Sequence, residues 1–312
     1  MHASVSPALT HSSTRVAQNV AAAVVSIEHK VPLGADPTTI RSGGPAPSSK
    51  VVRPDARRPG HAGDVSLHHE VWGRGQRLVL AHGFTQNRRC WGPFAHDLAA
   101  DHQVVLADLP GHGATPPEHD RADLTTAGEL LVEVGGEGIY VGYSMGGRVA
   151  LHAALSRPGA VRGLVLIGAT AGIDQPDARR ARTEADDALA EALDRVGLPA
   201  FLDRWLANPL FAGLSEPAAC RRERLANRQD GLASSLRHCG TGTQEPLWNR
   251  LGEVRIPVLV LVGSDDTKFT ELGNRLVAGL PDATLQSLPA THAVHLERPT
   301  ASASAVRAFL ES

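Results

Sequence analysis

Apolar residues in the middle and C-terminal parts of the chain form short continuous runs, at residues 78–81, 104–107, 139–141, 164–167 and 258–262. Short apolar runs that end at glycine, aspartate or proline are typical of strands buried on both faces. Helix-like segments, such as residues 91–99 and 147–156, lie between most of these runs. The alternation predicts an α/β fold in which a mostly parallel sheet is flanked by helices.

Two parts of the chain depart from this alternation. Residues 1–62 mix Ser, Pro, Gly, Ala and Arg without a sustained period of 2 or 3.6, which predicts a flexible or disordered leader. Residues 171–252 contain no strand-like run and have the pattern of helices, so we expect a helical lid inserted into the fold. The α/β core then comprises residues 63–170 and 253–312.

Composition narrows the classes of function. The 31 Lys and Arg residues against 33 Asp and Glu leave a formal net charge of −2, which does not favour nucleic acid or an anionic membrane as partner. No apolar run approaches the roughly 18 residues that a membrane span needs. The three cysteines are widely spaced, so neither a disulfide framework nor a zinc site is expected. We expect a soluble cytoplasmic protein, because the apolar stretch at residues 20–27 lacks the cleavage site of an export signal.

The segment Gly142-Tyr143-Ser144-Met145-Gly146 follows an apolar run directly and precedes a helix-like stretch. This GxSxG pattern between a strand and a helix predicts a nucleophile elbow, in which Ser144 is raised above the sheet. The chemistry requires small residues two positions to either side of the serine, because the chain turns sharply there. The alternative is a plain strand-to-helix turn.

An oxyanion hole would need exposed backbone N–H groups that face this elbow. His82-Gly83-Phe84 ends the apolar run at residues 78–81, and we expect the amides of Phe84 and Met145 to form the hole. The alternative is that His82-Gly83 makes only a tight turn.

A serine nucleophile of this kind requires an acid after a late strand and a histidine in a later loop. Asp265 and Asp266 both follow the last long apolar run, and Asp266 is preferred although the sequence separates the two poorly. His292 follows a candidate strand and is preferred to His295, which could be a loop histidine near the start of a helix. The order Ser, Asp, His predicts a catalytic triad.

Together these motifs resemble those of the α/β-hydrolase superfamily, over about residues 64–312. The resemblance rests on residues 82–84, 108–113, 142–146 and 263–266 and on His292. Within the superfamily the chain is similar to the 2-succinyl-6-hydroxy-2,4-cyclohexadiene-1-carboxylate synthase family of menaquinone biosynthesis. That narrower similarity rests on GYSMGGR at residues 142–148, on Arg179, Arg182 and Asp186, on WLANPLF at 205–211 and on DTKF at 266–269.

The resemblance implies that Ser144, Asp266 and His292 form the triad. The substrate-binding residues that it implies are Tyr143, Arg148, Arg182, Trp205 and Arg228. The substrate of the family carries three carboxylates, and guanidinium groups bind carboxylates through paired hydrogen bonds. However, residues 171–252 contain 11 Arg against 12 Asp and Glu, so surface ion pairs are the alternative role for the lid arginines. Trp205 could equally belong to the core of the lid.

The resemblance also implies a reaction. It is a lyase reaction that eliminates pyruvate from 2-succinyl-5-enolpyruvyl-6-hydroxy-3-cyclohexene-1-carboxylate, with the triad as proton-abstracting base and with no metal or organic cofactor. The expected partner is a small polycarboxylate, and nothing in the sequence indicates the oligomeric state. A carboxylesterase or another serine hydrolase that acts by acyl transfer is the main alternative, since this fold serves many chemistries. A non-catalytic receptor is a second alternative, against which the complete triad argues.

Overall fold

The computed structural model describes residues 66–311, so the leader predicted at residues 1–62 lies outside the described residues. One sheet has the strand order β1-β3-β2-β4-β5-β6-β7. Its strands are β1 His69–Trp72, β2 Arg77–Ala81, β3 Gln103–Ala107, β4 Gly138–Tyr143, β5 Val161–Ile167, β6 Val258–Gly263 and β7 Ala283–Leu288. Strand β1 pairs antiparallel with β3, and every other neighbouring pair is parallel. The predicted α/β class with a mostly parallel sheet is confirmed.

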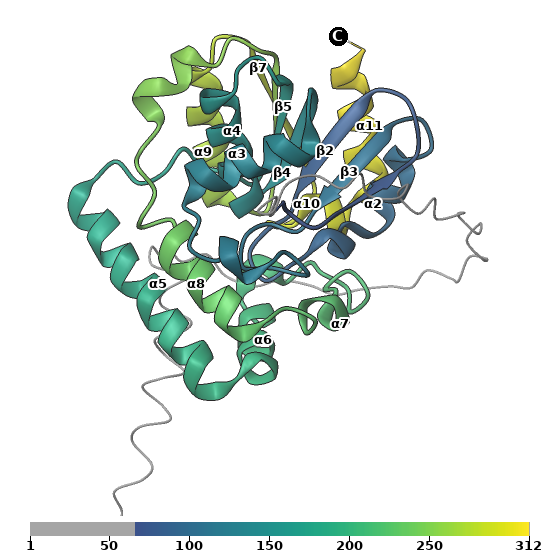
Figure 1. The fold of residues 1–312 in the computed structure, drawn as a ribbon. Helices are drawn as coiled ribbons and strands as arrows, with labels where there is room; N and C mark the ends of the chain where they lie inside the picture. Colours follow the sequence, from purple (N-terminus) through teal and green to yellow (C-terminus); the bar gives the residue numbers. More distant parts are fainter. Residues whose placement is uncertain (1–65, 312) are drawn as a thin grey trace, which may run out of the picture.

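Helices pack on both faces of this sheet (Figure 1). One face carries α3 (Leu124–Gly135), α4 (Met145–Ser156) and α9 (Thr267–Gly279), and the other carries α2 (Gly92–Leu98), α10 (Val294–Glu297) and α11 (Pro299–Leu310). Successive residues of a strand enter opposite cores: Val79 of β2 packs into the first and Leu80 into the second. This burial on both faces explains why the strands are continuous apolar runs in the sequence.

Between β5 and β6 the chain builds a separate group of helices. They are α5 (Pro176–Val196), α6 (Leu198–Leu206), α7 (Arg221–Arg224) and α8 (Gln229–Cys239). Figure 1 shows them together beyond one end of the sheet. Leu189, Leu193, Phe201 and Leu232 form a small core of their own there, because each long helix presents an apolar stripe to its neighbours. Residues 171–252, where the sequence predicts a lid, contain these helices and no strand.

Short 3₁₀ turns complete the described chain, at η1 Arg88–Trp91, η2 Pro117–His119, η3 Pro209–Phe211 and η4 Trp248–Glu253. Among residues 66–311, no helix combines the length and the apolar character that crossing a bilayer would require.

Candidate active site

Ser144 occupies the turn between β4 and α4, with φ 51° and ψ −109°. A positive φ is strained for a residue other than glycine and persists only when its surroundings enforce it. The surroundings are crowded here: a Cβ on Gly146 would lie 1.9 Å from the carbonyl oxygen of Ala81, and one on Gly142 would lie 2.4 Å from the carbonyl oxygen of Gly146. The two glycines therefore allow the chain to turn sharply around Ser144, at the N-terminus of α4.

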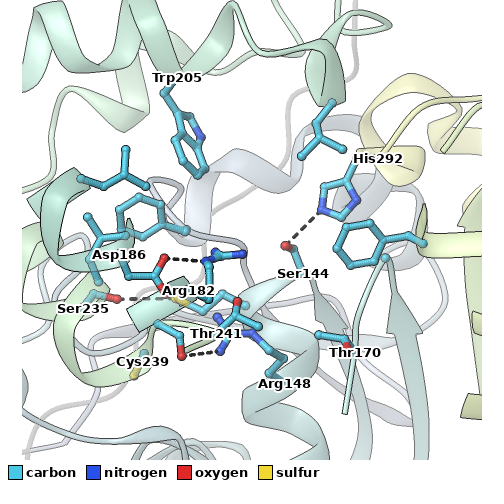
Figure 2. A pocket seen from close by; sticks show the side chains of 18 of the residues that line it. Ser144, Arg148, Thr170, Arg182, Asp186, Trp205, Ser235, Cys239, Thr241 and His292 are labelled. Atoms are coloured by element: carbon cyan, nitrogen blue, oxygen red, sulfur yellow. Dashed lines mark hydrogen bonds and ion pairs between the residues drawn. The ribbon is translucent and has the colours of Figure 1, made fainter. Parts of the chain in front are cut away.

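His292 lies between Ser144 and Asp266. Its Nε2 atom is 3.1 Å from Ser144 Oγ, as Figure 2 shows, and its Nδ1 atom is 2.9 Å from Asp266 Oδ2. Asp266 comes directly before α9, and its other oxygen accepts a hydrogen bond from the Phe269 amide at 3.1 Å. The carboxylate is thus held by the start of a helix while it faces the imidazole. This arrangement can transfer the Ser144 proton to His292, with Asp266 orienting the ring.

Asp265 and His295, the sequence alternatives to Asp266 and His292, make no hydrogen bond to the triad. Asp265 is exposed, and its carboxylate accepts a hydrogen bond from Ser264 Oγ at 3.1 Å. His295 is fully buried, and its ring lies 4.4 Å from Tyr143 and 4.8 Å from Trp91 between centroids. Of the two acids and two histidines weighed, only Asp266 and His292 are hydrogen-bonded in line with Ser144.

The loop after β2 carries Phe84, one of the two residues expected to supply an oxyanion hole. Phe84, Met145 and Ser144 line one cavity. Within the loop, the Gly83 amide donates to Gln86 Oε1 at 3.0 Å, and the Gln86 amide donates to the Gly83 carbonyl at 3.1 Å. Gly83 also passes close to Tyr143, since a Cβ there would meet the tyrosine ring at 2.7 Å. The role of the Phe84 and Met145 amides stays a prediction.

The cavity beside Ser144 has a volume of about 100 Å³ and lies between the core and the lid helices (Figure 2). Its polar lining comprises Ser144, Arg148, Thr170, Arg182, Asp186, Ser235, Thr241, Lys268 and His292. Its apolar lining includes Phe84, Met145, Leu189, Trp205, Leu210, Phe211, Leu236 and Phe269.

Arg148, on the first turn of α4, is a cation in the floor of this cavity. Only 7% of its surface is exposed. Its Nη1 atom donates to the Gly240 carbonyl at 3.3 Å and to Gln244 Oε1 at 3.5 Å, both neutral acceptors. Burial lowers the pKa of the guanidinium to about 10, so it stays charged at neutral pH. A buried charge held by neutral oxygens is well suited to bind an anionic ligand.

Two further cations and one carboxylate line the same cavity. Arg182 Nε is 2.8 Å from Asp186 Oδ1, one turn along α5, and Asp186 is almost completely buried. Lys268 lines the cavity from the start of α9 and is exposed over much of its surface. Desolvation lowers the pKa of Lys268, and the charge of Arg182 lowers it further. Three cations thus face one lining carboxylate.

Lys268 was not among the residues proposed from the sequence. Its only signal was its place in the DTKF segment, two residues after Asp266.

The remaining residues implied by the family resemblance differ in their placement. Trp205 lines the cavity, and its Nε1 atom has no hydrogen-bond partner among the described residues. Tyr143 and Arg228 are not among the lining residues: the Tyr143 ring is buried 5.3 Å from that of His292. Arg228 instead forms an ion pair with Asp120, and its role in binding substrate stays a prediction.

The cysteines Cys90, Cys220 and Cys239 are buried free thiols. Cys239 lines the cavity, and burial raises its pKa to about 12, so it stays protonated. Within residues 66–311, no group of three or more His, Cys, Asp or Glu side chains is placed to hold a metal ion.

Several known proteins are similar to this chain in sequence and in fold. The model of the alpha/beta hydrolase family matches residues 78–305. A Bacillus subtilis protein, provisionally named 2-succinyl-6-hydroxy-2,4-cyclohexadiene-1-carboxylate synthase, is 35% identical over 76% of this chain and 91% of its own length. The synthase of the same name from Yersinia pseudotuberculosis is 32% identical over 76% of this chain and 88% of its own. The solved structure of MenH from S. aureus has a TM-score of 0.73 and 28% identity, covering 78% of this chain and 98% of that one. This chain therefore belongs to the alpha/beta hydrolase family of enzymes and, within it, to the 2-succinyl-6-hydroxy-2,4-cyclohexadiene-1-carboxylate synthases.

Proposed function

We propose that this enzyme is a lyase that eliminates pyruvate from 2-succinyl-5-enolpyruvyl-6-hydroxy-3-cyclohexene-1-carboxylate and yields 2-succinyl-6-hydroxy-2,4-cyclohexadiene-1-carboxylate. The observation that carries the proposal is Arg148, a buried cation in the cavity of Ser144 that is held by neutral oxygens. An acyl-transfer enzyme for neutral esters has no need of such a group. A polycarboxylate substrate does need it, and the relatives that share the name of this synthase support the same reading.

The triad supplies the base for this reaction. His292 Nε2 accepts the hydroxyl proton of Ser144, and Ser144 Oγ removes the proton from the carbon next to the succinyl carbonyl. The electrons of that C–H bond move through the ring and expel the enolpyruvyl oxygen. The imidazolium of His292 returns its proton to the departing group, which leaves as pyruvate. No acyl-enzyme forms, and the triad ends in its starting protonation state.

Negative charge develops on the succinyl carbonyl oxygen when the proton leaves. We assign the binding of this oxyanion to the backbone N–H groups of Phe84 and Met145, which line the cavity together with Ser144. Asp266 would orient His292 and stabilise its charged form, for which the 2.9 Å hydrogen bond is suitable.

The substrate carboxylates would be bound by the cationic side chains of the cavity. Arg148 and Arg182 can bind carboxylates through two parallel hydrogen bonds, and Lys268 can act as a point charge. Trp205 adds a donor, since its Nε1 atom faces no acceptor in the described part of the chain. Because Asp186 already neutralises Arg182, Arg148 and Lys268 would attract the substrate most strongly.

The three buried free thiols fit a reducing compartment, and we propose that the reaction takes place in the cytoplasm.

The decisive experiment incubates the purified protein with the enolpyruvyl precursor and follows pyruvate by coupled reduction with lactate dehydrogenase. We expect stoichiometric release of pyruvate and of the cyclohexadiene, and no release by Ser144→Ala. Efficient hydrolysis of neutral esters without pyruvate release would make the protein a serine hydrolase instead.

A further inference from the structure

The lid reaches the loop of Phe84 through one buried arginine. Arg224, the last residue of α7, is 1% exposed. Its Nε atom donates to the Ala219 carbonyl at 2.8 Å. Its Nη1 atom donates to the Phe84 carbonyl at 3.4 Å and to Thr85 Oγ1. Arg224 therefore joins the lid to the peptide that directly follows the Phe84 amide.

Asn227 strengthens the same connection. Its Nδ2 atom donates to the Thr85 carbonyl at 2.6 Å, and its Oδ1 atom accepts from the Gly113 amide at 2.6 Å. Thr85 has φ 65°, a conformation that is strained for a β-branched residue and that needs support from its surroundings. The lid residues Arg224 and Asn227 provide that support from a distant part of the chain.

The charge of Arg224 is not neutralised by a carboxylate. All of its hydrogen-bond acceptors are neutral oxygens, and it takes part in none of the ion pairs found among residues 66–311. Burial is the main reason why the pKa of His82 and of His295 is low, and the positive charge of Arg224 lowers both further. The positive charge of Arg224 thus acts on His82, directly after β2, and on His295, which packs against Tyr143. A field of this sign stabilises negative charge nearby.

We propose that Arg224 is a positioning residue for the oxyanion hole: it holds the loop so that the Phe84 N–H faces the oxyanion, and it keeps an uncompensated positive charge next to that loop. The inference rests on the oxyanion role proposed above for the Phe84 amide. Arg224 makes no contact with substrate in this scheme and acts through the loop alone.

The test uses Arg224→Gln, Arg224→Lys and the control Arg221→Gln. Arg221 belongs to the same short helix but forms an exposed ion pair with Asp203. The probe is phenylboronic acid, which adds to a serine oxygen as a tetrahedral anion and so places negative charge where the oxyanion would lie. We measure its Kd together with kcat and KM for pyruvate release, and the melting temperature of each variant.

Arg224→Gln should lower kcat and weaken phenylboronic acid binding by on the order of tenfold or more, because a misplaced oxyanion donor loses most of its effect. The KM should change much less, since the substrate carboxylates bind elsewhere. Arg224→Lys should recover part of both losses, because it restores the charge without the guanidinium fork. Arg221→Gln should match the unmodified enzyme in every measurement.

Three results would overturn the inference. The first is Arg224→Gln with unchanged kcat and unchanged boronate affinity, whatever its melting temperature. The second applies if Arg224→Gln does not fold, in which case Arg224→Lys is the deciding variant. A kcat and a phenylboronic acid affinity equal to those of the unmodified enzyme in Arg224→Lys would then count against a positioning role. The third is an unmodified enzyme that does not bind phenylboronic acid. Because the boronate needs no lyase substrate, Arg224-dependent binding without pyruvate release would refute the proposed reaction and support this inference.

Discussion

Arg148 Nη1 lies 3.3 Å from the carbonyl oxygen of Gly240, which follows the last residue of α8. Arg148 belongs to α4, the core helix that begins directly after Ser144. The hydrogen bond therefore joins α4 to the C-terminal end of the lid helix α8. Because the acceptor is neutral, the bond orients the guanidinium without cancelling its charge. Within the proposed function, the same side chain binds a substrate carboxylate and holds the lid next to it.

Arg148→Ala should reduce kcat/KM for pyruvate release. The expected loss of transition-state stabilisation is about 2 to 5 kcal/mol, the range for removing one partner of a buried charge pair. Arg148→Lys should retain kcat/KM only in part, because an ammonium group cannot make the paired hydrogen bonds of a guanidinium. Steady-state kinetics with the enolpyruvyl precursor measures both effects. Hydrolysis of p-nitrophenyl acetate is the control and should hardly change. Equal losses in both assays would mean that Arg148 supports the elbow rather than the substrate.

Ser144→Ala, His292→Ala and Asp266→Asn should each suppress turnover, by roughly 10³-fold or more for Ser144 as the group that touches substrate. The matched control is Asp265→Asn, which removes the neighbouring carboxylate that is exposed and bonded to Ser264. Its kcat should equal that of the unmodified enzyme. An inactive Asp265→Asn combined with an active Asp266→Asn would show that the hydrogen bond to His292 does not identify the acid.

Lys268→Met should raise the KM for the tricarboxylate substrate by about tenfold, corresponding to roughly 1.4 kcal/mol of lost charge attraction. The kcat should fall less, because the proton transfer takes place between Ser144 and His292 and does not involve Lys268. Lys268→Arg keeps the charge and should retain most of the affinity. An unchanged KM in Lys268→Met would remove this residue from the binding site.

The protein should lose stability in mild acid because it buries neutral histidines. Burial lowers the pKa of these side chains to about 4 or about 3, as for His82, His112, His152 and His295. In the unfolded chain a histidine titrates near 6.5, so between these values the unfolded state binds more protons. The free energy of unfolding should therefore fall by about 1.4 kcal/mol per pH unit per histidine as the pH drops from 6.5 toward 4.

His295→Phe tests this account at one position. His295 is surrounded by aromatic rings, and neither ring nitrogen has a partner among the described residues. Replacing it should reduce the dependence of the free energy of unfolding on pH by the share of one histidine, as measured by urea unfolding at several pH values. The exposed His69→Gln is the control and should leave the slope unchanged. A slope in His295→Phe identical to that of the unmodified protein would contradict the prediction.

A protein that begins at Asp64 should fold and retain activity. The strands of the sheet, the triad and the cavity all lie within residues 66–311. Thermal unfolding and pyruvate release, compared with the full chain, measure the effect. A fall in melting temperature of more than about 5 °C, which corresponds to ~1 kcal/mol or more, would show that residues 1–63 contribute to the stability of the core.

The sequence by itself was sufficient for the features that depend on local patterns. Continuous apolar runs indicated strands buried on both faces, and the structure has them at β2 to β6. The glycines around Ser144 indicated the elbow, because a sharp turn needs small residues at fixed spacing. The order of Ser144, an aspartate after β6 and a histidine after β7 followed from where strands end, since parallel strands bring their carboxyl ends to one edge.

Only the tertiary structure decided which neighbouring side chains face the cavity. Asp265 and Asp266 are adjacent in sequence, yet the start of α9 turns one carboxylate to solvent and the other to His292. The arginines of the lid show the same effect. Arg228 pairs with Asp120, whereas Arg224, four residues earlier and in the preceding helix α7, is buried against the Phe84 loop. These contacts join residues more than 100 positions apart. They depend on the relative position and rotation of packed helices, and no local pattern in the sequence encodes either quantity.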